Sequence, residues 1–332
     1  MRGPVIVVGG IVLVAAGAAV GTAARPPMKP MPPDCVARTD AEARPTRVAT
    51  LSAGMIAFCL EGSAETSCWT VDLATGRYAR GPELAPFVDA GDAGPPSDGE
   101  DPPPTPEAKG ALTVARTPRN VKVCKTGTSD CRTYAPKGLP KGGGPLRASV
   151  NEAGTLMVVE IPGVSSTVAF AETYDLVTGK RIARFKVAKP DGPCGGAELL
   201  GDTVMLTTSV CEGPGESSWL ATPAGKKIAM VGGKDSISTA ETTPVRVDGD
   251  VWAFDAGNGG AEVVLQNVRT GAVTKRIALP TDADRGGPAT ALASDGAGGL
   301  VVVTGDPHDG DVLVLDVAAG TVKKTYSPPL CR

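Results

Sequence analysis

The residues best placed to do chemistry lie in one short segment near the carboxyl end, Gly305-Asp-Pro-His-Asp-Gly-Asp311. It holds the chain's single histidine, His308, among the carboxylates Asp306, Asp309 and Asp311. Oxygen ligands at this density suit calcium, although the spacing differs from that of an EF-hand loop. Asp-Gly is also a typical turn dipeptide. We therefore interpret the segment as a turn first and as a calcium site second.

Catalysis by a nucleophile has little support in the sequence. A Ser–His–Asp arrangement would have to use His308, and no Gly-x-Ser-x-Gly turn is present to expose a serine. Hydrolysis by paired carboxylates depends on the distance between two carboxyl groups, which a sequence does not give. We therefore favour a non-catalytic protein, with an enzyme that uses carboxylates as the alternative.

Cysteine is the second chemically informative residue type. The chain has eight cysteines, no Cys-x-x-Cys pair and one histidine, so a zinc site is not expected. An even number of cysteines in an exported chain is typical of a disulfide framework. The eight are Cys35, Cys59, Cys68, Cys124, Cys131, Cys194, Cys211 and Cys331.

The amino terminus indicates export. Met1 and Arg2 precede an apolar, glycine-containing run, Val5–Val20, and small residues follow it as a cleavage site. Residues 1–24 are thus a signal peptide or an uncleaved membrane anchor, since about 20 apolar residues can span a bilayer. Residues 25–34 are a proline-rich spacer. We expect the rest of the chain outside the cytoplasm, periplasmic or secreted, and at a membrane only if the anchor is retained.

Charge excludes nucleic acid as an expected partner. The formal net charge is −3 at pH 7, whereas binding to a phosphate backbone needs clustered lysines and arginines. A hydrophobic fraction of 42% is enough for a packed core, and 43 glycines with 30 prolines imply many turns. The composition fits two ordinary domains or one large repeat domain.

A short motif repeats along the chain. Its clearest copies, Asp72–Gly76 and Asp175–Gly179, read Asp-x-x-Thr-Gly. Each copy follows an apolar run and precedes an extended one, as in a β-hairpin whose Asp bonds to backbone amides and whose glycine takes a positive φ. The six copies end at Gly76, Gly127, Gly179, Gly225, Gly271 and Gly320.

Each repeat contains about four strands. Dense apolar runs such as Met55–Leu60 and Leu300–Thr304 precede the turns and are typical of strands buried on both faces. Shorter candidate strands, for example Arg147–Val150, precede these runs. Four antiparallel strands in about 40 to 50 residues is the pattern of a propeller blade. We predict an all-β chain, a β-propeller of six four-stranded blades over residues 35–332, with seven blades as the alternative.

On these residues the chain resembles the superfamily of repeat β-propellers that includes quinoprotein-type and YVTN-type blades. The resemblance covers about residues 46–328 and rests on the turn motif after an apolar strand. It implies a fold class and no activity. Quinoproteins place a tryptophan after the turn glycine, whereas Trp69, Trp219 and Trp252 precede their turns. Quinone binding is therefore not implied, and no cofactor is expected apart from the candidate calcium.

The predicted blades select one pairing of the cysteines. Cysteines that flank the same hairpin lie within disulfide reach, and the remaining pair would join the first and last blades. The predicted bridges are Cys59–Cys68, Cys124–Cys131, Cys194–Cys211 and Cys35–Cys331.

Basic residues follow most of the turns, for example Lys180, Arg181, Lys323 and Lys324. They fall in the predicted fourth strand, which forms the outer edge of a blade. Charges at a sheet edge discourage aggregation, and we favour this interpretation over a binding patch.

The connections from second to third strands, and from one blade to the next, share one face of a propeller, where ligands bind. The longest, at about residues 89–107, is acidic and rich in proline and glycine, so we expect it to be disordered. We interpret this face as a solvated surface first, and as an acidic platform for a cationic partner or calcium second. Its predicted carboxylates are Glu61, Glu65, Glu212, Glu216, Asp255, Asp282, Asp284, Asp306, Asp309 and Asp311.

These features predict an exported, non-catalytic binding or scaffold β-propeller of the cell envelope. We expect a monomer with a protein or small-molecule partner at the loop face. The alternative is an extracytoplasmic propeller enzyme, lactonase-like or glycan-acting, that uses carboxylates near a central channel.

Overall fold

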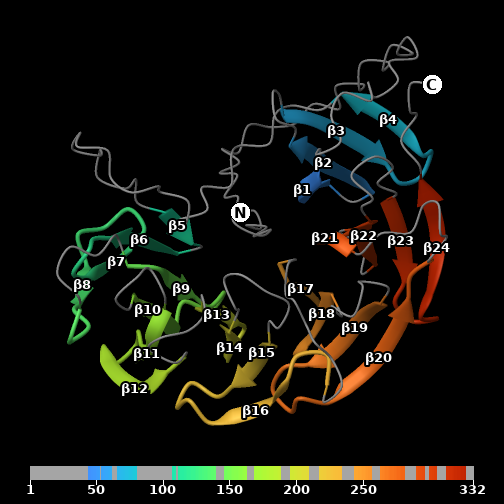
Figure 1. Cartoon of the computed structure of the whole chain (residues 1–332). Coiled ribbons are helices and arrows are strands. Elements are labelled where there is room, and N and C mark those ends of the chain that lie inside the picture. The colour runs from blue at the N-terminus through green and yellow to red at the C-terminus, as the bar shows by residue number, and fades with distance from the viewer. Residues whose placement is uncertain are drawn as a thin grey trace, which may run out of the picture. The chain divides into compact units, whose positions relative to one another are not determined.

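The structure, a computed structural model, describes residues 44–52, 54–61, 66–80, 107–109, 111–139, 146–162, 168–187, 195–208, 217–233, 243–255, 262–280, 289–295, 299–304 and 312–326. These residues form 24 strands, β1 to β24, in six four-stranded antiparallel sheets, and no helix (Figure 1). Consecutive strands are neighbours in every sheet, which is the pattern of a propeller blade. The predicted fold class, a β-propeller with six four-stranded blades, is confirmed.

The chain divides into two compact units, and the first unit holds the first and last blades. It consists of Met1–Leu84 and Thr281–Arg332. Blade one comprises β1 (Arg44–Ser52), β2 (Met55–Glu61), β3 (Thr66–Asp72) and β4 (Arg77–Arg80). Blade six comprises β21 (Ala289–Ser294), β22 (Leu300–Thr304), β23 (Val312–Asp316) and β24 (Thr321–Tyr326).

The second unit, Ala85–Pro280, holds the other four blades. Blade two comprises β5 (Glu107–Lys109), β6 (Leu112–Arg116), β7 (Val121–Lys125) and β8 (Cys131–Tyr134). Blade three comprises β9 (Ala148–Val150), β10 (Leu156–Pro162), β11 (Val168–Asp175) and β12 (Lys180–Lys186). Blade four comprises β13 (Gly195–Leu200), β14 (Thr203–Thr208), β15 (Ser217–Ala221) and β16 (Lys227–Met230). Blade five comprises β17 (Val245–Asp248), β18 (Val251–Asp255), β19 (Glu262–Asn267) and β20 (Val273–Ala278).

The ends of the predicted segments need one correction. The acidic segment expected to be disordered at about 89–107 ends earlier, because Glu107 is the first residue of β5. Residues 89–106, the predicted signal or anchor segment and the spacer lie outside the described residues. In the described part of the chain, no helix is long and apolar enough to cross a membrane.

The repeated turn joins the third and fourth strands of a blade. In blade three, Asp175 Oδ1 accepts hydrogen bonds from the amides of Val177 and Thr178 at 2.8 and 3.0 Å. Gly179 closes the turn with a φ of 76°, which a residue with a Cβ rarely adopts. The predicted hairpin chemistry of the motif is therefore correct.

A bulge follows the turn in four blades and alters the outer edge of each sheet. The pairing between third and fourth strands skips one residue, three positions after the turn glycine, and this extra residue bends the edge strand. A twisted edge with basic residues pairs poorly with another chain, in line with the interpretation of the basic fourth strands. The skipped residues are Ile182, Ile228, Thr274 and Lys323.

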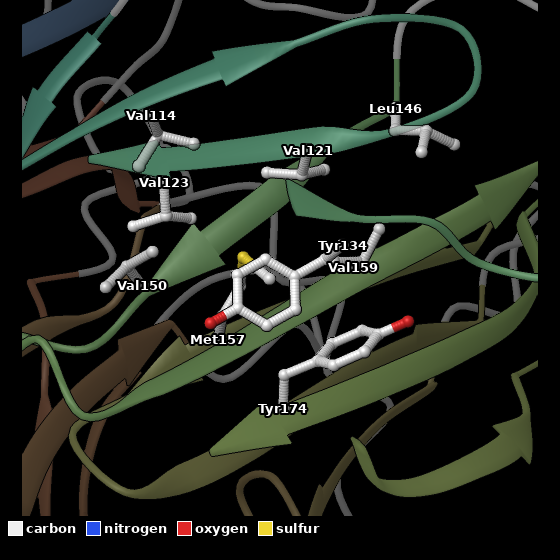
Figure 2. Packing of buried hydrophobic residues seen from close by; sticks show 9 residues of the cluster. All are labelled: Val114, Val121, Val123, Tyr134, Leu146, Val150, Met157, Val159 and Tyr174. Carbon is white, nitrogen blue, oxygen red and sulfur yellow. The ribbon is translucent and has the colours of Figure 1, made fainter. Parts of the chain in front are cut away.

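The apolar cores lie between adjacent blades. Figure 2 shows the core between blades two and three, where Tyr134 and Tyr174 meet edge to face with ring centroids 5.0 Å apart. Further clusters join blades three and four, blades four and five, and, in the first unit, blades six and one. In β10, Met157 and Val159 belong to the core with blade two and Val158 to the core with blade four, so both faces of this strand are apolar there.

The turn glycine also lies against a side chain of the preceding blade. In the second unit, a Cβ at Gly179 would lie 2.8 Å from Arg132 Nη1 of blade two, and one at Gly225 would lie 2.7 Å from Phe185 Cδ1 of blade three. A Cβ at Gly271 would overlap the Cβ of Ala229 in blade four. Strands β8, β12 and β16 thus each pack a side chain into space that the next blade leaves open by having no Cβ at its turn.

Blades six and one make the same contact within the first unit. A Cβ at Gly76 would lie 2.6 Å from the Tyr326 ring of β24. The Tyr326 hydroxyl donates a hydrogen bond to the Leu73 carbonyl, and Lys324 Nζ donates to that carbonyl at 3.3 Å. Blade six therefore packs against blade one in the same way as blade four packs against blade five, although blades six and one are at opposite ends of the sequence.

Candidate functional site

One end of each blade carries the connections that leave the sheet. Because the four strands are antiparallel and consecutive, the link from second to third strand starts at the end where the chain enters and leaves the blade. We call this the loop end, and the opposite end, with the Asp-x-x-Thr-Gly turns, the turn end. The loop end is where residues 81–106, 163–167, 209–216 and 256–261 connect the strands.

Four charged residues gather near the loop end of the second unit. Arg116 is the last residue of β6, Arg147 directly precedes β9, Glu160 lies in β10 and Glu198 lies in β13. We call them the Glu160 cluster. The Glu160 amide donates to the Arg147 carbonyl at 2.9 Å, and Arg116 Nη2 donates to the Ala148 carbonyl at 3.3 Å. Backbone pairing thus holds Arg147 beside Glu160, and the Arg116 bond ties blade two to blade three at the same place.

Glu160 is the buried centre of this cluster. The residue is 6% exposed, and its Oε1 accepts a hydrogen bond from the Ala197 amide of blade four at 2.5 Å. The other oxygen, Oε2, is buried without a hydrogen bond among the described residues and lies 4.0 Å from Arg147 Nε. One carboxyl group of blade three therefore binds the backbone of blade four with one oxygen only.

Burial controls the ionisation of this carboxyl group. It raises the pKa of Glu160 to about 7, against the lowering effects of the Ala197 amide, Arg147 and Arg116 and with a smaller raising effect from Glu198. Burial disfavours the charged form of an acid because the surroundings solvate charge less well than water does. Glu160 is thus a group that gains or loses a proton near neutral pH.

A second contact lies beside the first. The Leu199 amide of β13 donates a hydrogen bond to Ser149 Oγ of β9 at 3.3 Å. β13 is an edge strand of its sheet, so its outward amides need partners from outside the blade. Ser149 and Glu160 of blade three supply two of them.

Blade five has an acid at the same register position. Glu160 lies four residues after Leu156, which pairs with Asp175, the first residue of the turn motif. Asp255 likewise lies four residues after Val251, which pairs with Asn267, the first residue of the motif in blade five. Asp255 is 3% exposed. The prediction that Asp255 lies on a solvated surface is therefore wrong.

A second buried carboxylate serves blade packing. Glu172 is fully buried and accepts hydrogen bonds from the Tyr174 hydroxyl, from Arg181 Nη1 at 2.9 Å and from Arg184 Nη1 at 3.2 Å. Arg184 Nη1 also donates to the Lys137 carbonyl at 2.5 Å. This carboxylate uses its oxygens within the protein, and we assign it to the joint between blades two and three.

One predicted disulfide is present in the described residues. Cys124 and Cys131 are directly opposed in β7 and β8 and are bonded. Cys59 and Cys68 are register partners in β2 and β3, which is the placement that the predicted bridge requires. The other two predicted bridges, Cys194–Cys211 and Cys35–Cys331, lie outside the described residues.

The predicted calcium residues lie outside the described residues too. They are Asp306, His308, Asp309 and Asp311, in the connection between β22 and β23. In the part of the chain that the structure describes, no group of three or more His, Cys, Asp or Glu side chains is arranged to hold a metal ion.

Sequence reasoning overlooked the Glu160 cluster. The one signal was a carboxylate inside an otherwise apolar strand, Met157-Val-Val-Glu-Ile161. A charged residue in such a run is rarely buried without a partner. The partners, an amide of the next blade and two arginines from other strands, are not apparent from the sequence.

Comparison with known proteins gives a likeness to solved structures alone. No protein-family model matches the chain, and no curated protein matches it. BamB from Moraxella catarrhalis is 14% identical, with a TM-score of 0.43 and coverage of 65% of this chain and 61% of that chain. The C-terminal WD40 domain of Sif2 is 10% identical, with a TM-score of 0.42 and coverage of 65% of this chain and 57% of that chain. Kluyvelomyces marxianus Hsv2 is 12% identical, with a TM-score of 0.41 and coverage of 65% of this chain and 61% of that chain. The match thus spans less than two thirds of each of these chains, and we take no function from them.

Proposed function

We propose that the protein is an exported, non-catalytic binding or scaffold β-propeller, with its partner held at the loop end of the blades. The observation that carries the proposal is the difference between the two ends. The turn end is closed by short, regular hydrogen-bonded turns, whereas the longest connections and the Glu160 cluster belong to the loop end. Binding residues in proteins concentrate on loops that a rigid scaffold positions.

The disulfide supports the export part of the proposal. Disulfides persist in oxidising compartments and are rare in the cytosol. The Cys124–Cys131 bond of blade two and the apolar amino-terminal segment are together typical of a periplasmic or secreted protein. The partner class that we propose is a protein or a small molecule.

Catalysis by Glu160 is less well supported. A carboxyl group with a pKa near 7 suits a general acid or base. Such a group must reach a substrate proton, but Glu160 Oε2 is buried and Oε1 is occupied by the Ala197 amide. The geometry favours a structural role for this carboxyl group.

Site-specific cross-linking from both ends of the second unit tests the binding proposal. Arg119 lies in the exposed connection between β6 and β7 at the loop end, and Lys226 is exposed in the turn of blade four at the turn end. A photo-reactive residue at either position reports on contacts of that end. We expect a discrete adduct with an envelope component from position 119 and none from position 226.

Charge reversal gives the matched control. In a chain without the photo-reactive residue, Arg119→Glu should reduce co-purification of the partner found by cross-linking, and Lys226→Glu should leave it unchanged. Equal cross-linking from both ends, or turnover of a small substrate by the purified chain, would contradict the proposal.

A further inference from the structure

Blades three and four are joined at their first strands by two bonds from side chain to backbone. Ala197 donates to Glu160 and Leu199 donates to Ser149, over 2.5 and 3.3 Å. Gly196 lies beside the first bond, and a Cβ there would be 3.5 Å from Glu160 Oε1. The two bonds differ in one respect, since Glu160 can change its charge and Ser149 cannot at ordinary pH.

The charged groups around Glu160 come from three strands or their ends. Arg147 adjoins β9, Arg116 ends β6, and Glu198 lies on β13. Arg147 Nε is 4.0 Å from Glu160 Oε2, which has no hydrogen bond within the described part of the chain. An ionised Glu160 is therefore held by an amide on one oxygen and by a nearby guanidinium on the other, while a protonated one loses the attraction to Arg147 and Arg116.

We propose that Glu160 is a proton-operated link between blades three and four. The ionised carboxylate makes a charge-assisted bond to Ala197, and such bonds are roughly twice as strong as neutral ones. Proton uptake converts this bond to a neutral one and frees Arg147 from its ion pair. The bond between blades three and four is therefore stronger at pH values above the Glu160 transition and weaker below it. It lies near the loop end of the blades.

Two effects of the proton act in opposite directions. Protonation removes a buried charge and so stabilises the second unit as a whole. It also weakens the particular bond to Ala197. Since burial has the larger effect on the pKa of Glu160, which it raises to about 7, the transition falls near neutral pH. This inference does not depend on the proposed binding function, because no partner takes part in it.

Nuclear magnetic resonance of the full chain tests the link directly. In protein labelled with ¹³C at the Glu side-chain carboxyl and ¹⁵N at Ala, the Glu160 carboxyl carbon and the Ala197 amide should titrate together, with a midpoint of about 7. The Ala197 amide proton should move upfield as the pH falls, because its bond weakens. A midpoint closer to 7 than to 4.5, the ordinary value, supports the proposal, and one closer to 4.5 overturns it.

Two variants provide the controls. Glu160→Gln keeps an oxygen that can accept from Ala197 but cannot ionise, so the Ala197 titration should disappear. Glu152→Gln removes an exposed carboxylate of the same blade that pairs with Arg246, and the titration should remain. An Ala197 transition that persists in Glu160→Gln would overturn the proposal. If that variant does not fold, coincidence of the two midpoints in the wild-type chain decides the question.

Discussion

Replacing a turn glycine by alanine separates two roles that the repeat motif combines. Gly127 and Gly271 both lie in turns between the third and fourth strands, in blades two and five, with φ of 75° and 78°. Gly127 follows Lys125, the residue opposite the start of the second strand, by two positions, and Gly271 follows the equivalent Asn267 by four. A Cβ at Gly127 would have no described atom within 4 Å, whereas one at Gly271 would overlap Ala229 Cβ and lie 3.1 Å from Ile228 Cγ2. Within the second unit, Gly127→Ala therefore changes backbone preference alone, and Gly271→Ala also disturbs the contact with blade four.

The magnitudes follow from these two environments. A residue with a Cβ in the left-handed region costs about 1–2 kcal/mol, and both variants incur this cost. Overpacking of a filled site adds about 1–3 kcal/mol, and Gly271→Ala alone incurs it. Ala229 cannot rotate its methyl group away, because the group is fixed to the backbone, so β16 itself would have to move. We expect a loss of about 2–5 kcal/mol for Gly271→Ala.

Urea unfolding of the two variants beside the wild type measures the difference. The free energy of unfolding should fall further for Gly271→Ala than for Gly127→Ala, by about 1–3 kcal/mol. Hydrogen exchange at the Ala229 amide should accelerate only in Gly271→Ala. Equal losses in the two variants would show that turn glycines serve φ alone and that the blade contact has no energetic weight.

Four further predictions concern other parts of the chain. Because the pKa of Glu160 is about 7 in the fold against an ordinary 4.5, stability should fall by about 3 kcal/mol as the pH rises through that interval, and Glu160→Gln should abolish this dependence in pH-resolved urea titrations. Glu172→Ala should cost about 3 kcal/mol, near the lower end for a broken buried pair because its two arginines reach solvent, as measured by calorimetry. Cys124→Ser should lower stability by about 2 kcal/mol under oxidising conditions and leave it unchanged relative to wild type under full reduction. Deletion of residues 91–104 should leave the melting temperature within a few degrees of wild type, because we predict that this acidic segment is disordered and buries little; a large drop would show that it packs on a blade.

The blades could be predicted from the sequence because their signals are local. The turn motif and the apolar runs act within a few residues, through bonds such as those from Asp175 to its own turn and through the burial of both strand faces. The register of each hairpin then follows, and with it the pairing of Cys124 with Cys131. Six repeats made these signals consistent, so the sequence alone predicted the fold class and six blades, with seven as the alternative.

The contacts between blades were decided only by the tertiary structure. The sequence predicted that Gly271 is needed for a positive φ. The structure adds that its missing Cβ leaves room for Ala229 of the preceding blade. Glu160 was one carboxylate in an apolar strand, and its ionisation depends on burial and on an amide of another blade. Packing and electrostatics between segments depend on distances in space, and these are set by how whole sheets stack rather than by any spacing along the chain.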